Sequence, residues 1–349
     1  MRGRGATHNP PNRFERISYE PEPEDGDTGD SSQPLPPTAL FRDTSRTIIA
    51  LNESPDVGFD ASVNPYRGCE HGCVYCYARP THEYLGFSSG LDFETKIMVK
   101  EDAPALLRER LASPAWRPQV LAVSGVTDPY QPAERRLKLT RRCLEVLAEF
   151  RNPVVIVTKN YLVTRDIDLL AELAAVRAAA VFVSVTTLDS ALARLMEPRA
   201  SAPEKRLGAI RALARSGVPA GVMVAPVIPG LTDHEIPSII EAAVEAGAGY
   251  AGRVVLRLPH AVKELFESWL EEHFPDRKQK VLNRIRAVRG GKLNDPRFGS
   301  RMRGEGIFAE QIDSLFRAAC KKFGIYGHSP DLSADAFRRP SGDQLSLFA

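Results

Sequence analysis

Short apolar segments recur along the middle of the chain and alternate with longer amphipathic segments. The apolar segments predict strands at 118–126, 153–157, 180–185, 221–225 and 250–256, with a further strand near 62–65. The amphipathic segments predict helices at 133–150, 165–175, 203–216, 234–246 and 263–272. Strands that alternate with helices of this length predict βαβ units and a parallel sheet.

Six such units are fewer than the eight of a closed barrel, which takes about 250 residues. We therefore expect an α/β fold, a partial open (β/α)6 barrel of the TIM type, over residues 46–272. In sheets of this kind the chemistry lies at the carboxyl ends of the strands.

The flanking segments differ from this core in composition. Residues 1–45 are rich in Pro, Gly, Ser and acidic residues and predict a disordered leader. Residues 273–328 predict a helical basic appendage, and residues 329–349 a flexible tail. No run of eighteen apolar residues predicts a membrane span, and no apolar stretch follows the basic start of the chain. We therefore expect a cytoplasmic protein without a membrane partner.

Charge is distributed unevenly, although the formal net charge is only +2. Between Asp276 and Lys322 there are 13 Lys and Arg against 5 Asp and Glu, a local net charge of +8. Such a segment either contacts the phosphates of DNA or forms a solvated helical face. The candidate phosphate ligands are Arg284, Arg286, Arg289, Arg301 and Arg303.

Three of the five cysteines, Cys69, Cys73 and Cys76, fall within eight residues with the spacing C-x3-C-x2-C. Thiolates are soft ligands that suit iron–sulfur clusters. Three of them can hold three corners of a [4Fe–4S] cluster and leave the fourth iron open to another ligand. Gly68 and Gly72 allow the backbone to turn tightly around such a cluster.

A zinc site of these three cysteines with His71 as the fourth ligand is the alternative. Structural zinc sites usually show paired ligands separated by a longer loop, which this spacing does not provide. The spacing therefore favours the cluster.

The cysteine spacing, with an aromatic residue directly before Cys76, resembles the signature of the radical S-adenosylmethionine superfamily. The resemblance extends over roughly residues 45–270 and implies the partial barrel fold. It also implies an enzyme whose open iron binds S-adenosylmethionine and cleaves it to a 5′-deoxyadenosyl radical, which abstracts a hydrogen atom from the substrate. An electron donor such as flavodoxin or ferredoxin would reduce the cluster.

Within the superfamily the chain looks similar to the branch of spore photoproduct lyase, a DNA-repair enzyme. By that resemblance Tyr75 packs near the adenine of the cofactor, and Tyr77 is a catalytic residue in radical transfer. Ser124, Thr127 and Asp128, in the turn SGVTDPY, lie where family members hold the amino group of the methionine.

Three further positions follow from the same resemblance. Lys159, in the sequence VTKN, is similar to a lysine that pairs with the methionine carboxylate. Ser184 matches a contact to the ribose or carboxylate, and Arg199 an arginine of the cofactor pocket. Fixed positive charge is what a carboxylate in a pocket requires.

The chain departs from the lyase at its hydrogen-donating cysteine. Cys143 and Cys320 are the candidates, but neither matches by spacing, and each lies on an apolar helical face that favours a buried structural thiol. Reversal of a photoproduct is thereby in doubt. The substrate is DNA or another nucleic acid, or else a protein, RNA or a small molecule. A non-catalytic iron–sulfur protein with a redox-sensing role is the alternative of another class.

The tail ends in an apolar group on a polar segment, with Gln344, Leu345, Leu347 and Phe348 in the sequence QLSLF. Such residues either fold back onto the barrel or dock into the pocket of a partner. The five residues resemble the short motif by which bacterial polymerases and repair proteins bind the sliding clamp, which implies clamp docking.

Overall fold

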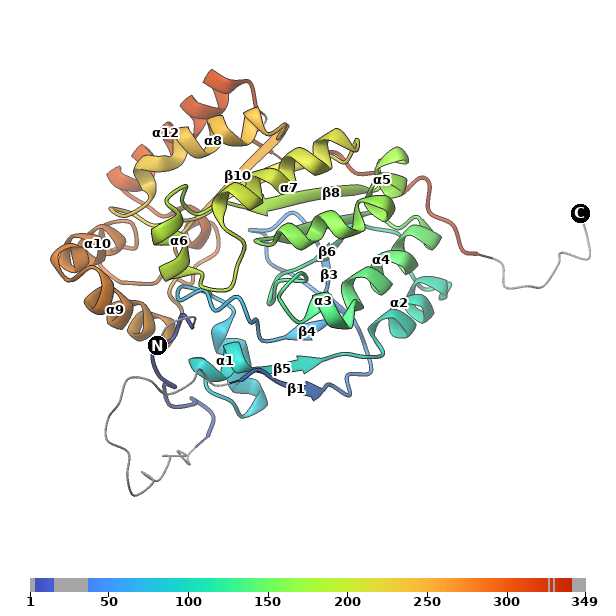
Figure 1. The fold of residues 1–349 in the computed structure, drawn as a ribbon, viewed down its shortest axis with the longest axis horizontal. Coiled ribbons are helices and arrows are strands. Elements are labelled where there is room, and N and C mark those ends of the chain that lie inside the picture. Colours follow the sequence, from blue (N-terminus) through green and yellow to red (C-terminus); the bar gives the residue numbers. More distant parts are fainter. Residues whose placement is uncertain (1–3, 16–36, 326, 329, 341–349) are drawn as a thin grey trace, which may run out of the picture.

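A computed structural model describes residues 4–15, 37–325, 327–328 and 330–340 (Figure 1). A seven-stranded sheet forms its centre. Its strands are β2 (Ile49–Leu51), β3 (Ala61–Val63), β6 (Leu121–Val123), β7 (Val154–Thr158), β8 (Ala179–Ser184), β9 (Ala220–Val227) and β10 (Tyr250–Val255). Their spatial order is β10-β9-β8-β7-β6-β3-β2, in which all neighbours pair in parallel except β2, which pairs antiparallel with β3.

The sheet stays open, with β10 and β2 as its two edges. Every residue of β3, β6 and β8 is buried, as expected for parallel strands with both faces covered. The predicted α/β fold with six parallel strands in an open barrel is thereby confirmed.

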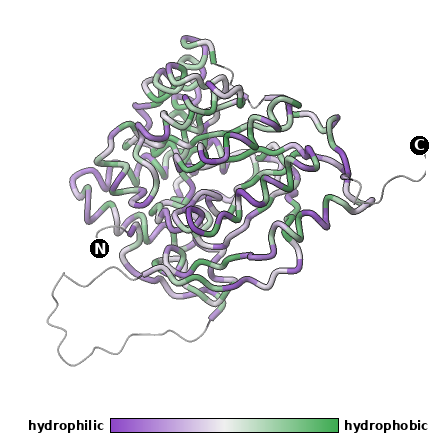
Figure 2. The backbone as a smooth tube through the Cα atoms, turned by 45° about the vertical axis from the view of Figure 1, so that its right-hand side comes forward, coloured by the Kyte–Doolittle hydropathy of each residue, from purple (hydrophilic) through white to green (hydrophobic). Residues whose placement is uncertain are grey.

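Helices follow the strands and cover the sheet. They are α2 (Ala103–Ala112), α3 (Glu134–Leu137), α4 (Leu139–Phe150), α5 (Ile167–Ala175), α6 (Ser190–Met196), α7 (Pro203–Arg215), α8 (Ile236–Glu245) and α9 (Val262–His273). The short 3-10 helices are η1 (Arg79–Leu85), η2 (Tyr161–Asp166) and η3 (Asp233–Glu235). Hydrophobic and hydrophilic residues alternate along the helices (Figure 2), as expected for helices with one buried and one exposed face.

One predicted helix is divided in two. The segment 133–150 is broken at Lys138, whose φ of 52° is left-handed and separates α3 from α4. The apolar pattern continues across the break because Leu137 and Leu139 both pack into the same small cluster with Tyr66 and Ile97.

A second sheet, which the apolar pattern does not predict, lies beside the first. It has the order β1 (Ala39–Arg42), β5 (Lys96–Val99) and β4 (Tyr66–Arg67), and α1 (Leu91–Thr95) precedes β5. β1 and the described residues 4–15 belong to the segment expected to be a disordered leader. The structure differs from that expectation here, because both parts make specific backbone contacts to later residues.

The basic segment contains α10 (Pro275–Ala287), α11 (Ser300–Arg303) and α12 (Ile307–Phe323). Ile312, Phe316 and Cys320 of α12 belong to the same hydrophobic core as the sheet, so the appendage shares the core of the barrel. Cys143 on α4 is buried in that core as well, as expected for a structural thiol. None of the described helices has the length and apolarity needed to cross a membrane.

Candidate active site

The cysteine loop, residues 64–79, leaves the carboxyl end of β3. The Cys69 N–H donates to the Phe93 carbonyl at 2.9 Å, and the Val74 N–H donates to the Met196 carbonyl at 3.0 Å. Cys69 and Cys73 are buried, and Cys76 is half-buried. The loop is therefore fastened on both sides, and its thiols face the interior.

The three thiols fit the role of cluster ligands. Burial raises the pKa of each of them, and for Cys69 the nearby charges of Asp128, Cys73 and Cys76 add to the effect. Backbone N–H groups approach two of the sulfurs, one from Asp128 at Cys69 and two from Ala78 and Arg79 at Cys76. Such donors stabilise a thiolate once iron has displaced its proton.

The zinc alternative has less support. His71 is fully occupied, since its Nδ1 lies 3.3 Å from Asp128 Oδ2 and its Nε2 lies 3.1 Å from Asn160 Nδ2. His71 is therefore a structural residue of the loop.

Arg79, fully buried, organises the loop from within. Its Nε donates to the Cys73 carbonyl at 3.0 Å, and its Nη2 donates to the Gly72 carbonyl at 3.2 Å. The same Nη2 pairs with Glu94 Oε1 at 2.5 Å. Arg79 is not among the residues predicted from the sequence, although an arginine three positions after the last cysteine of a compact loop was a signal for it.

The described amino-terminal residues cover this pair. The backbone N–H groups of Gly5 and Ala6 donate to the carboxylate of Glu94 at 3.0 and 2.8 Å. Gly5 lies so close to the loop that a Cβ there would be 1.6 Å from the Gly72 carbonyl oxygen. Only glycine fits this approach.

Asp128 and Thr127 brace the loop from the turn after β6. Thr127 Oγ1 donates to the Gly68 carbonyl at 2.7 Å. Asp128 accepts from Thr158 Oγ1 and from the Lys159 N–H, both at 2.7 Å. Burial alone would raise the pKa of Asp128, but His71 and these hydrogen bonds outweigh it and hold that pKa below its usual value.

Lys159 extends into a buried polar network with Glu197 at its centre. Lys159 Nζ lies 3.0 Å from Glu197 Oε1 and donates to the Ala225 carbonyl at 2.9 Å. Arg206 and the hydroxyl of Tyr75 also contact Glu197. Burial and the neighbouring charge of Arg206 lower the pKa of Lys159 to about 7.

The structure thus brings Tyr75 and Lys159 together, with Lys159 Nζ 5.7 Å from the centre of the Tyr75 ring. Glu197 and Arg206 were missed, because charges far apart in the sequence give no sign of pairing. Ser184, at the end of β8, is buried, and its carbonyl accepts from Arg206 Nη1 at 3.1 Å.

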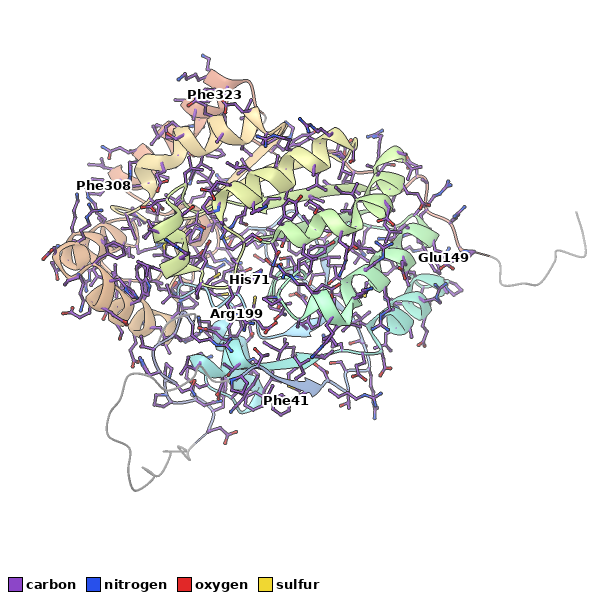
Figure 3. The ribbon with its side chains drawn as sticks, in the orientation of Figure 1. Phe41, His71, Glu149, Arg199, Phe308 and Phe323 are labelled. Atoms are coloured by element: carbon purple, nitrogen blue, oxygen red, sulfur yellow. The ribbon has the colours of Figure 1, made fainter. Side chains whose placement is uncertain are left out.

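Arg199 lies against the outer side of the cysteine loop. Its N–H donates to the His71 carbonyl at 3.2 Å, and its Nη1 lies 3.1 Å from Glu70 Oε1 and 3.2 Å from Thr38 Oγ1. Figure 3 shows Arg199 and His71 close together near the middle of the molecule. The side chain is thus engaged with the loop, and its predicted contact with a cofactor stays a prediction.

Tyr77 is the exposed member of the loop, with 47% of its surface accessible. Its hydroxyl donates at 2.5 Å to the carbonyl of Gly125, which directly follows Ser124. The guanidinium of Arg257 lies over the Tyr77 ring, 5.1 Å from its centre.

The chain superposes on spore photoproduct lyase with bound AdoMet and dinucleoside spore photoproduct, with a TM-score of 0.61 and 16% identity over 82% of this chain and 80% of that one. It is 40% identical to an uncharacterized protein of Mycobacterium tuberculosis over 65% of this chain and 68% of the relative. An uncharacterized protein of Methanocaldococcus jannaschii is 27% identical over 67% of this chain and 84% of that relative.

The family model for the radical SAM superfamily matches residues 63–243, just over half of the chain. The matched range begins at the end of β3 and includes the cysteine loop, Asp128, Lys159 and Arg199. The members of this family are enzymes that use a [4Fe–4S] cluster and S-adenosylmethionine. With its open parallel sheet and its three cysteines in this loop, the chain belongs to the radical SAM superfamily.

Proposed function

We propose that this enzyme acts on nucleic acid, with its cluster bound by Cys69, Cys73 and Cys76. When bound, the cluster and S-adenosylmethionine supply an electron and a 5′-deoxyadenosyl radical that takes a hydrogen atom from the substrate. The lysine, aspartate and arginine predicted to contact the cofactor adjoin the cysteine loop or its bracing turn. Asp128 accepts from the Lys159 N–H at 2.7 Å, and the Arg199 N–H donates to the His71 carbonyl at 3.2 Å. Tyr77, exposed beside Cys76, is proposed to relay the radical.

The observation that carries the nucleic-acid assignment is the charge of residues 276–322, which adjoin the end of β10. Not every arginine there is free for phosphate. Arg289 is buried, and its Nη2 donates to the carbonyls of Val255 and Leu256 at 2.9 and 2.6 Å. The interpretation of Arg289 as a phosphate ligand was therefore wrong.

The remaining basic side chains support the proposal. Lys280, Lys292 and Arg303 are exposed, and Arg286 is half-buried on α10. Arg284 instead packs over Phe308, 3.6 Å from its ring centre. This segment carries an excess of positive charge, part of it exposed, which favours a polyanionic substrate over a neutral one.

The test uses anaerobically reconstituted full-length protein under a strong reductant. We expect cleavage of S-adenosylmethionine to 5′-deoxyadenosine and methionine, and transfer of deuterium from deuterated nucleic acid into 5′-deoxyadenosine. Transfer from a protein or small-molecule substrate, but not from nucleic acid, would contradict the proposal. A cluster without any cleavage would favour the non-catalytic iron–sulfur protein.

We further propose that the tail docks to the bacterial sliding clamp. The residues concerned, Gln344, Leu345, Leu347 and Phe348, lie outside the described part of the chain. The support is the motif itself, and clamp docking would bring the enzyme to replicating or damaged DNA.

The clamp test is a titration of purified clamp with the full chain, with a chain that ends at Asp343, and with Leu347→Ala/Phe348→Ala. Micromolar or tighter binding that is lost in both variants is expected. Equal behaviour of all three proteins would contradict clamp docking.

A further inference from the structure

A segment of the basic region, residues 295–303, connects the two open edges of the main sheet, and we call it the bridging segment. On the β10 side, Arg289 binds the strand-end carbonyls described above and donates through Nη1 to the Ser300 carbonyl at 2.9 Å. On the β2 side, the Gly299 N–H and Arg301 Nε donate to Asp56 at 2.6 and 2.5 Å. Asp56 lies in the loop between β2 and β3, so the bridging segment crosses the opening of the sheet.

Arg257 lies at this opening, two residues after β10 ends. Its Nη1 lies 3.5 Å from Met302 Sδ of the bridging segment, and its buried Nε has no hydrogen-bond partner among the described residues. Within the described part of the chain it forms no ion pair with a carboxylate. Burial and the nearby charge of Arg301 lower the pKa of Arg257, so an anion would relieve an unfavourable environment.

Phe298 is the second unusual residue of the opening, because 60% of its surface is exposed. The guanidinium of Arg301 lies over its ring, 4.4 Å from the centre. Arg301 is itself fixed by Asp56 and Ser54. One face of the phenylalanine is therefore backed by a held cation, while much of the ring remains open to a planar partner.

These features match the chemistry of a nucleotide. Phosphate pairs with a guanidinium, and a nucleobase stacks on an aromatic ring, each stacked base contributing about 1–3 kcal/mol. Tyr77 links the surface around Arg257 to the predicted cluster site. Its ring lies under the Arg257 guanidinium, and it directly follows Cys76 in the sequence. A ligand held at the opening would thus be held beside the reactive centre.

We infer that Arg257 and Phe298 form a nucleotide-recognition site in which Arg257 binds a phosphate and Phe298 stacks on an unpaired base. The inference rests on the proposed function and narrows its substrate class. In an intact duplex, neighbouring bases cover both faces of each base, so a stacking site of this kind selects single-stranded or locally unpaired nucleic acid.

The experiment measures binding of the reconstituted full chain to a fluorescent single-stranded oligonucleotide and to a duplex of the same sequence. Tighter binding of the single strand is expected. Phe298→Ala should weaken single-strand binding by about 5- to 150-fold, the equivalent of one lost stacked base. Arg257→Gln should weaken it and lower the dependence of log affinity on log salt by about one.

Matched controls lie on another part of the surface. Tyr161 is 41% exposed and has Lys205 Nζ 5.6 Å from its ring centre, so it is also an aromatic residue paired with a cation. Tyr161→Ala should leave binding unchanged, as should Arg211→Gln, which neutralises an exposed arginine on α7 outside the basic segment. Phe298→Tyr keeps an aromatic ring and should retain tight binding. Weaker binding of Phe298→Ala would then reflect loss of the ring and not a general intolerance of substitution at this position.

Two outcomes would overturn the inference, and they differ in what else they affect. If duplex and single strand bind equally well and Phe298→Ala has no effect, the recognition site is contradicted, whereas the proposal of a nucleic-acid substrate still stands. If the protein binds neither oligonucleotide, both the recognition site and the proposed substrate class are contradicted.

Discussion

The cysteine loop and the bridging segment differ in how the charged side chains around them are paired. In the cysteine loop the guanidinium of Arg79 is buried and bonded to carbonyls and to Glu94. At the bridging segment Arg257 has a buried nitrogen without a partner, and Phe298 is exposed. The Arg79 guanidinium is fully hydrogen-bonded within the protein and makes the loop rigid, whereas the unpaired nitrogen of Arg257 leaves a donor for an external partner.

The strongest test of this contrast concerns the cysteines. Replacing Cys69, Cys73 or Cys76 by Ala should abolish iron binding and cleavage of S-adenosylmethionine, since each removes one cluster ligand. Iron content and 5′-deoxyadenosine formation are the measurements. Cys143→Ala, in the core, should retain both, and loss of iron in that control would show that the assay reports misfolding.

The second test removes the internal support of the loop. Arg79→Met leaves Glu94 buried without its partner and should lower the free energy of unfolding by about 3–5 kcal/mol. Arg108→Met breaks an exposed pair with Glu149, whose side chains are 50% and 34% accessible, and should cost less than about 1 kcal/mol. Urea unfolding under anaerobic conditions compares the two variants, and equal losses would refute the distinction.

The third test uses pH. His82 is buried beside Gly68, its Nε2 lies 2.9 Å from the Lys96 carbonyl oxygen, and burial lowers its pKa from 6.5 to about 4. As the pH falls, His82 is therefore protonated at a higher pH in the unfolded chain than in the folded protein. About 3 kcal/mol of stability should be lost between pH 6.5 and 4 and retained above that window.

His82→Gln is the matched control for this pH effect. Its amide can donate the same hydrogen bond and does not titrate. The difference in unfolding free energy between the two proteins should therefore change with pH over that window. Parallel stability curves for the two proteins would contradict the assignment to His82.

A fourth test concerns the amino-terminal contact with the loop. Gly5→Ala should detach residues 4–15 and cost about 2 kcal/mol, since two N–H groups lose a charged acceptor. Faster proteolysis of this segment is the readout. Gly58→Ala places a Cβ where no atom lies within 4 Å and should have no such effect.

The smallest stability effect is expected at the bridging segment. Phe298→Ala should change the free energy of unfolding by less than about 0.5 kcal/mol, because the ring is largely exposed. Phe266→Ala, in the core between α9 and α10, should cost about 3–5 kcal/mol. A large loss at Phe298 would mean that this ring serves the fold and not a ligand.

The sequence predicted the parallel strands well, because buried strands such as β8 are continuous apolar runs. The local spacing of the three cysteines predicts them as cluster ligands, and the structure places all three in one loop. The sequence could not predict the network around Glu197, since Lys159 and Arg206 lie far from each other in the chain. Composition also gave no sign that Gly5 binds Glu94, 89 residues away. Long-range pairs of this kind depend on the finished fold.

The contact between Gly5, Ala6 and Glu94 has a consequence for biosynthesis. Gly5 and Ala6 are synthesised before the three cysteines, whereas their carboxylate acceptor Glu94 is synthesised after them. The amino-terminal segment therefore cannot dock until the whole cysteine loop has been made.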